Sequence, residues 1–172
     1  MKKFGLESAN SVRTPMSPNV KLTVDLLGKS VDSSLYKSII GSFLYLTASR
    51  PDISYSVGVY VRYQANPKES HMIALKRIIK YVKTTTEFGV WYSKDTNDVL
   101  AGYPDADWAG NADDRKSTSG GCFYVGNNLV FWMSKKQNSI SLSTTEAKYI
   151  ATSSCCTQFL RMQKLLHDYG IC

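Results

Sequence analysis

The sequence has few of the residues that build metal clusters or disulfide frameworks. Its 172 residues include four cysteines and two histidines, and no two cysteines have the C-x-x-C spacing. A structural zinc site or a disulfide scaffold is therefore not expected. Thiols used in this way are typical of a reducing compartment, where they serve as small core residues.

Long hydrophobic runs are also absent. No stretch of the sequence is long and apolar enough to cross a bilayer. The first three residues, MKK, are followed by FGLESAN, which contains a charge and forms no apolar segment of the kind a signal peptide needs. The sequence therefore predicts an intracellular protein, in the cytoplasm or nucleus, with no membrane partner.

Among the charged residues of the sequence, basic residues outnumber acidic ones. The chain has 21 Lys and Arg residues against 14 Asp and Glu residues, which gives a net charge of +7 and a pI near 9.2. Such a balance favours polyanionic partners such as nucleic acid through Coulomb attraction and counterion release. A hydrophobic content of 43% is enough for a folded core.

The first half of the chain changes from a linker-like to a helical pattern. Residues 1–33 are rich in Ser, Thr, Pro and Asn, and their two X-Pro pairs favour extended or turn conformations. Three helices are expected after this linker, at residues 35–48, 52–64 and 69–84. Pro51 and Pro67 stand where the second and third would begin.

The third expected helix carries a basic face. Lys76, Lys80 and Lys83 recur at i, i+4 and i+7, opposite an apolar stripe that includes Leu75 and Ile78. These lysines form either a solvated face or a contact for nucleic acid, and the solvated face is the favoured interpretation.

The second half changes to a period of two and then returns to a helix. Strands are expected at residues 99–109, 121–125 and 129–134, with a hairpin turn at 126–128. The third strand is apolar on both faces, so a helix should pack on this sheet. Residues 143–169 supply it, with one apolar stripe and Gly170 at the stop. The stripe consists of Ala147, Ala151, Cys155, Phe159, Met162, Leu166 and Tyr169. The predicted fold class is therefore α+β.

Several strings along the chain occur in the order found in one protein family. They are YKSIIGSFLYLT (36–47), SRPDI (49–53), RIIKYVK (77–83), GYPDADWAG (102–110), DDRKSTSG (113–120), SKKQ (134–137) and LSTTEA (142–147). Together they resemble the end of the reverse transcriptase and the start of the ribonuclease H domain in copia-type retrotransposon Pol polyproteins. The resemblance implies that residues 34–92 are the helical, thumb- or connection-like end of the polymerase. Residues 97–172 would be the N-terminal half of a ribonuclease H-like domain, with three antiparallel strands followed by a long helix.

The resemblance also implies a chemistry. Ribonuclease H hydrolyses the RNA strand of an RNA:DNA hybrid with two Mg²⁺ ions, which prefer carboxylate oxygens as ligands. Asp105 matches the family's catalytic and metal-binding Asp on the first strand, and Glu146 matches its Glu on the first long helix. The third acid belongs to a fourth strand that would begin where this chain stops. The sequence therefore predicts an incomplete site, weak or absent Mg²⁺ binding, and a chain that is not an active enzyme.

Both acids, and their neighbour Asp107, have structural alternatives. Asp107 shares a strand face with Asp105 because side chains alternate, and it is either an accessory acid or a solvated neighbour, the latter being favoured. Glu146 is also the fourth residue of a capping box that begins at Ser143. Two departures from the family pattern stand close by. Pro104 removes a backbone donor from the first strand, and Lys148 replaces an acid.

Four further basic residues could contact phosphates without reading sequence, namely Arg115, Lys116, Lys135 and Lys136. A solvated loop explains them equally well.

Three hypotheses follow for the whole chain. It is an inactive Pol remnant with residual affinity for RNA:DNA hybrids, an active nuclease completed by further sequence, or a reused, effector-like interaction protein. The open edge of the first strand also predicts self-association through strand pairing.

Overall fold

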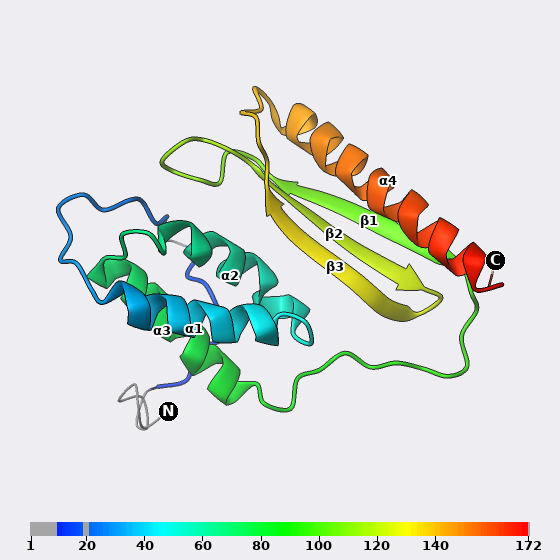
Figure 1. The fold of residues 1–172 in the computed structure, drawn as a ribbon, viewed down its shortest axis with the longest axis horizontal. Coiled ribbons are helices and arrows are strands. Elements are labelled where there is room, and N and C mark those ends of the chain that lie inside the picture. The colour runs from blue at the N-terminus through cyan, green and yellow to red at the C-terminus, as the bar shows by residue number, and fades with distance from the viewer. Residues whose placement is uncertain (1–9, 19–20, 172) are drawn as a thin grey trace. The chain divides into compact units, whose positions relative to one another are not determined.

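The computed structural model describes residues 10–18 and 21–171. The chain divides into two compact units, Met1–Gly89 and Val90–Cys172. Figure 1 shows that the first unit is helical and that the second combines a sheet with one long helix. The predicted mixed α+β class is therefore confirmed. Among the described residues, no helix is long and apolar enough to cross a membrane.

In the residues of the first unit that the structure describes, there are three α-helices. They are α1 (Ser33–Leu46), α2 (Ser54–Tyr60) and α3 (Glu69–Thr84). The Asp32 side chain accepts a hydrogen bond of 2.8 Å from the Ser34 amide, so α1 starts two residues before its expected position. The helix expected over 52–64 is interrupted, because 3₁₀ turns flank α2 at Pro51–Ile53 and Val61–Tyr63.

A core of aliphatic and aromatic side chains holds these helices together. Leu75 and Ile78 of α3 are fully buried, as are Tyr36 of α1 and Val57 of α2. The Tyr36 hydroxyl donates a 2.9 Å hydrogen bond to the Tyr60 carbonyl, so this buried polar group has a partner. The apolar stripe predicted for the third helix is the face that α3 buries.

The segment expected to be a linker packs along the helical unit where it is described. The Tyr63 hydroxyl donates to the Leu22 carbonyl at 3.0 Å, and Nε2 of His71 lies 2.7 Å from the Thr23 carbonyl oxygen. His71 is fully buried, stacks on the Tyr63 ring at 4.1 Å, and its Nδ1 accepts from the Lys68 amide. Residues 21–31 are thus held to the start of α3.

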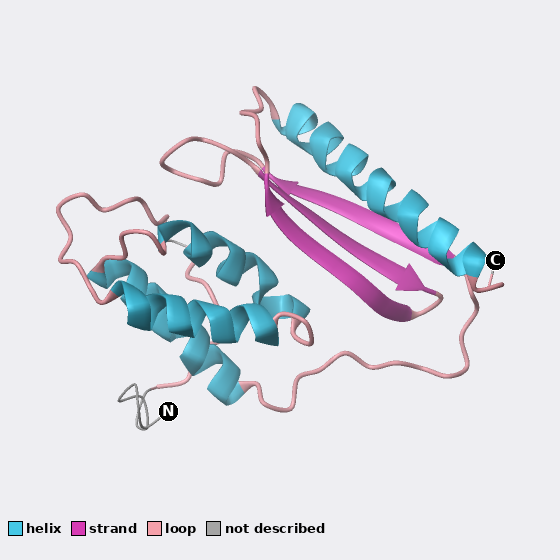
Figure 2. Cartoon of the chain, viewed as in Figure 1, coloured by secondary structure: helices cyan, strands magenta, loops and turns pink. Residues whose placement is uncertain are grey.

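The second unit is a three-stranded antiparallel sheet with one helix on it (Figure 2). The elements are β1 (Leu100–Asp107), β2 (Thr118–Val125), β3 (Asn128–Lys136) and α4 (Thr144–Asp168). The order in the sheet is β1-β2-β3, and the expected hairpin lies between β2 and β3, where Gly126 has a φ of +57°. Only glycine adopts that conformation without strain. All three expected strands and the long helix are confirmed.

Small residues allow α4 to approach the sheet closely. Ala147, Ala151 and Cys155 are buried on its sheet-facing side. A Cβ atom placed on Gly102 of β1 would lie 3.2 Å from the Phe123 ring and 3.4 Å from the Cys155 sulfur. Glycine at this position therefore lets the helix, β1 and the fully buried Phe123 ring meet.

The C-terminal half of α4 differs from the sequence expectation. The predicted stripe is buried at Ala147, Ala151 and Cys155, but Met162 and Leu166 are only partly buried, and Tyr169 is 74% exposed. The reason is that α4 packs on β1 and β2. Phe131 of β3, expected beneath a helix, therefore remains 39% exposed.

Candidate functional site

The three predicted acidic residues do not share one environment. Asp105 lies on β1 opposite Gly120, and its side chain is exposed. Gly102 is opposite Phe123, whose ring faces α4. Directly opposed residues share a face and successive residues alternate, so Asp105, three residues after Gly102, projects from the face that α4 does not cover.

Asp107, at the end of β1, serves the turn that follows. A Cβ atom on Gly110 would collide with the Asp107 carboxylate, so this side chain lies directly over the turn. The turn also includes Ala109, which has a φ of +50°. The Trp108 indole N–H donates a 3.1 Å hydrogen bond to the Ser141 carbonyl and so connects the turn to the loop before α4. Asp107 is therefore half-buried over this turn, and the choice between an accessory acid and a solvated neighbour stays a prediction.

Glu146 is exposed in the first turn of α4, and both its carboxylate and its amide are engaged in the helix start. Its Oε2 accepts a 2.6 Å hydrogen bond from the Leu142 amide, and its own amide donates to Oγ of the N-cap Ser143 at 3.1 Å. The Ser143 half of the predicted capping box is present, but the Glu146 carboxylate accepts from the Leu142 amide, one residue before the N-cap, rather than from the Ser143 amide. A carboxylate near this helix end is also favoured by the helix dipole.

A metal ion needs several converging donors, and the described carboxylates do not supply them. Over residues 10–18 and 21–171, no group of three or more His, Cys, Asp or Glu side chains could hold a metal ion. Asp105 faces away from the sheet side on which α4, and with it Glu146, packs. The acids described therefore do not form a ligand set that fits two Mg²⁺ ions.

The predicted phosphate-binding residues gather around the loop between β1 and β2 and the end of β3. Lys136 pairs with Asp114, whose Oδ1 also accepts from the Lys116 amide at 3.2 Å. Burial raises the pKa of Asp114, but the hydrogen bonds from Lys136 and Lys116 outweigh burial and hold this pKa below its usual value. Arg115 and Lys135 are exposed, and Arg115 has a φ of +56°. The charge of Lys136 is thus already balanced within the unit.

Gln137 is an important residue that the sequence interpretation did not single out. Its side-chain amide donates to Oγ of Ser119 at 3.0 Å and to the Ala147 carbonyl at 2.9 Å, while its oxygen accepts from Ser141. It is 5% exposed and joins β2, the loop before α4, and α4 itself. The only signal was its place at the end of the string SKKQ, since nothing local distinguishes a buried glutamine from a solvated one.

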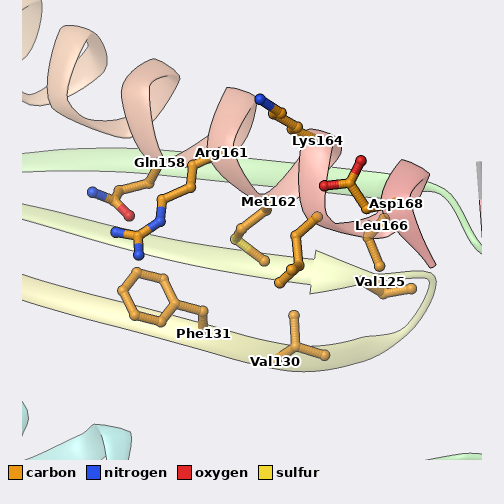
Figure 3. Close-up of a pocket in the computed structure, with 10 residues that line it drawn as sticks. Val125, Val130, Phe131, Gln158, Arg161, Met162, Lys164, Leu166 and Asp168 are labelled. Carbon is orange, nitrogen blue, oxygen red and sulfur yellow. The ribbon is translucent and has the colours of Figure 1, made fainter.

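An apolar groove runs between the C-terminal half of α4 and the β2–β3 hairpin. Its volume is about 690 Å³, and its lining includes Met162 and Leu166 of α4 with Val130 and Phe131 of β3. Val130 is the residue that the register skips between the pairs Phe123–Phe131 and Tyr124–Leu129, so a β-bulge shapes this wall. In Figure 3, Arg161 extends from the helix toward Phe131. The groove suits an apolar ligand or side chain rather than metal chemistry.

Comparison with known proteins finds relatives over nearly the whole chain. The Pol polyprotein from transposon RE1 of Arabidopsis thaliana is 39% identical over 95% of this chain, and that from transposon TNT 1-94 of Nicotiana tabacum is 33% identical over 99%. The chain spans only 11% and 13% of those two proteins. Secreted RxLR effector protein 161 of Plasmopara viticola is 40% identical over 69% of this chain, which covers 84% of that protein.

No family model and no solved structure matches the chain. The family assignment therefore rests on the sequence relatives. Identity at this level, extending through both units, agrees with the order of strings described above. The chain belongs to the family of copia-type retrotransposon Pol polyproteins.

Proposed function

We propose that the second unit descends from a ribonuclease H domain and that this chain does not cleave RNA:DNA hybrids. In this proposal the first unit derives from the helical end of a reverse transcriptase. Asp105 and Glu146 occupy the positions of ancestral metal ligands, and the ancestral cofactor is Mg²⁺. The protein is then a non-catalytic Pol segment with residual affinity for nucleic acid.

The observation that carries the ancestry is the order of elements around the acids. Three antiparallel strands precede one long helix, with an acid on the first strand and another in the first turn of that helix. The resemblance to the family implies this same order, and the Pol relatives cover both units. Two carboxylates placed in this way are what a half-domain of this type would retain.

Two features support the absence of catalysis. Two-metal hydrolysis needs carboxylates that converge on both ions. Asp105 projects from the sheet face opposite the one that α4 covers, and the Glu146 carboxylate is engaged by the Leu142 amide. Recruiting Glu146 to a metal would therefore break a hydrogen bond that starts α4.

The proposal is tested by hybrid cleavage with the purified chain. A labelled RNA:DNA hybrid is incubated with Mg²⁺ or Mn²⁺, using wild-type protein and Asp105→Asn side by side. We expect equal background for the two proteins. Cleavage by the wild type that Asp105→Asn abolishes would overturn the inactivity and favour the alternative of a nuclease.

A second candidate function is that of an interaction protein. It is favoured by the similarity to the protein named as a secreted RxLR effector, most of whose length this chain covers. The printed sequence contains no Arg-x-Leu-Arg string. An epitope-tagged chain expressed from its own gene decides between the two candidates. Accumulation outside the producing cells favours the effector-like role, and retention inside them favours the Pol-derived role.

A further inference from the structure

Two hydroxyl residues of this chain are followed directly by proline, in the pairs Thr14-Pro15 and Ser17-Pro18. A proline favours an extended backbone at the residue before it. An extended Ser or Thr followed by proline is the substrate that proline-directed protein kinases select. Thr14 is exposed and Ser17 is half-buried, so Thr14 is the more accessible acceptor of the two.

The Thr14 residue is already in contact with a guanidinium group. Nη2 of Arg77 donates a 2.9 Å hydrogen bond to Oγ of Thr14, and Nε of Arg77 donates a 3.0 Å hydrogen bond to the Thr14 carbonyl. Nε and Nη2 form one edge of the planar guanidinium, and arginine uses two such parallel donors to bind carboxylates and phosphates. A group that binds oxyanions is therefore in place at the Thr14 hydroxyl before any modification.

The segment that carries Thr14 crosses a basic face of α3. Oγ of Thr84 lies 3.4 Å from the Val12 carbonyl oxygen, one helical turn and a half beyond the contact at Arg77. At 100° per residue, Arg77, Lys80 and Thr84 fall within about 60° of one another around the helix. Lys80 therefore lies on the same face as the two residues that hold the segment.

Nearby carboxylates do not compete for the Arg77 guanidinium. The sequence contains no Asp or Glu between residues 70 and 86. Within residues 10–18 and 21–171, the ion pairs include none formed by Arg77. Residues 1–89 contain 13 Lys and Arg against 6 Asp and Glu, a net charge of +7, so the helical unit favours an added anion.

We propose that Thr14 is a phosphorylation site and that Arg77 binds its phosphate, so that the modification fastens residues 12–16 to α3. A separate, proline-directed kinase catalyses the transfer from a nucleoside triphosphate. Oγ of Thr14 bonds to the γ-phosphorus, the bond to the departing nucleoside diphosphate breaks, and a carboxylate of the kinase accepts the hydroxyl proton. The product carries a charge of about −1.5 to −2 and three strong acceptor oxygens beside Arg77.

The change in hydrogen bonding favours tighter attachment of the segment. In the unmodified chain the Thr14 hydroxyl donates to the Met16 carbonyl at 2.9 Å, and this donor is lost with the proton. The bond is exposed, so water replaces it. In return, the contact between Arg77 and a neutral hydroxyl becomes a charge-assisted bond to a phosphate oxygen, which is roughly twice as strong. Val12 and Met16, which pack against the helical core, should therefore be held more firmly.

The test compares the phosphorylated and the unmodified full chain. The chain is treated with a mitogen-activated protein kinase, ATP and Mg²⁺ and then separated from the kinase, and mass spectrometry locates the phosphate. Ser17→Ala confines the modification to Thr14. Amide hydrogen exchange at residues 12–16 then measures how firmly the segment is held. We expect phosphate on Thr14 and exchange that is slower by at least about threefold, with less slowing at high salt.

Substitutions at position 77 separate binding of the phosphate by Arg77 from a general effect of charge. In Arg77→Gln, phosphorylation should change the exchange rate by less than about 1.5-fold. Arg77→Lys keeps the charge but not the paired donors and should give an intermediate slowing. Lys37→Gln removes an exposed charge from α1 and should respond to phosphorylation like wild type. Circular dichroism should show unchanged helix content, because Arg, Lys and Gln have similar helix propensities.

Three results would overturn the proposal. A folded chain that takes no phosphate on Thr14 would remove the modification site. Exchange that stays the same or becomes faster after phosphorylation would show that the phosphate does not fasten the segment. Equal slowing in wild type and Arg77→Gln would assign the phosphate to other cations of the unit. None of these results depends on the ribonuclease H proposal, because no acid of the second unit takes part.

Discussion

At the residue scale, Arg50 links parts of the helical unit that are distant in sequence. It is 6% exposed and donates to both oxygens of the Asp52 carboxylate, at 2.9 and 2.7 Å. It also donates to the Thr85 carbonyl and hydroxyl at 2.8 and 2.7 Å, just past the end of α3. Tyr81 completes the network with a 2.8 Å hydrogen bond from its hydroxyl to Asp52. The string SRPDI is therefore explained by structure rather than by chemistry on a substrate.

Removing the Arg50 side chain should destabilise the helical unit substantially. Arg50→Ala removes the Arg50 donors from the half-exposed Asp52 carboxylate, which keeps the hydrogen bond from Tyr81. It also leaves the buried Thr85 carbonyl without the Arg50 donor, so the expected cost is about 1–3 kcal/mol. Urea unfolding followed by circular dichroism measures the difference. Lys37→Ala, an exposed change on α1, should stay within about 0.5 kcal/mol of wild type. A loss of similar size in both variants would contradict this account.

The same network predicts a pH dependence. Burial raises the pKa of Asp52, but the hydrogen bonds from Arg50 and Tyr81 outweigh burial and place this pKa below its ordinary value of 3.8. A lowered folded-state pKa means that the carboxylate stabilises the fold above pH 3.8 and loses that effect as the pH falls through the folded value. The unfolding free energy of wild type should therefore exceed that of Asp52→Asn by a constant amount from pH 5 to 7. This difference in unfolding free energy should shrink below about pH 4. A difference that grows toward low pH would contradict a lowered pKa for Asp52.

At the element scale, the start of α4 shows how one residue can serve a structural role beside the ancestral role that we propose for it. Glu146 and Ser143 bind backbone amides at the helix start, and this function needs only an acceptor oxygen at position 146. Metal binding would need the charge as well. The two roles can therefore be separated by changing the charge without removing the oxygen.

A pair of substitutions at Glu146 tests the capping role. Glu146→Ala should lower the unfolding free energy of the second unit by about 0.5–1 kcal/mol, as does the loss of a typical cap. Glu146→Gln keeps an acceptor and should retain most of that stability. Equal destabilisation by the two variants would show that the carboxylate charge, rather than the hydrogen bond, matters at this position. The measurement is thermal unfolding of the wild type and both variants, followed by a spectroscopic signal from α4, and it compares their unfolding free energies.

Close packing between α4 and the sheet gives a second prediction at this scale. Gly102→Leu places its side chain against Phe123 and Cys155, where a Cβ alone already meets atoms at 3.2–3.4 Å. Such overpacking should cost about 1–3 kcal/mol. Gly120→Ala is the matched control, since a Cβ there meets its nearest atoms at 4.0 Å. If denaturant unfolding shows the two variants to be equally stable, the helix is not packed on β1 as described.

At the scale of the whole molecule, local patterns predicted most elements but not how they cover one another. The bounds of α3 at Glu69–Thr84 follow from its apolar stripe, and the stop of α4 follows from Gly170, which has a φ of +70°. The exposure of Tyr169 and Phe131 could not be predicted, because it depends on which strands α4 crosses. The pair between Lys136 and Asp114 likewise joins residues 22 positions apart.

The candidate site shows the same contrast between what local sequence patterns predict and what depends on packing. The sequence named Asp105, Asp107 and Glu146 as acids of interest, but their faces and partners depend on strand register and helix packing.

The central claim is that Asp105 and Glu146 mark ancestry and do not assemble a metal centre in this chain. Mn²⁺ added to isotope-labelled protein broadens the NMR signals of amides close to a bound ion, so it reports directly on a shared site. The account predicts no selective, saturable broadening of both residues at stoichiometric Mn²⁺. Joint broadening of Asp105 and Glu146 that disappears in Asp105→Asn would contradict it.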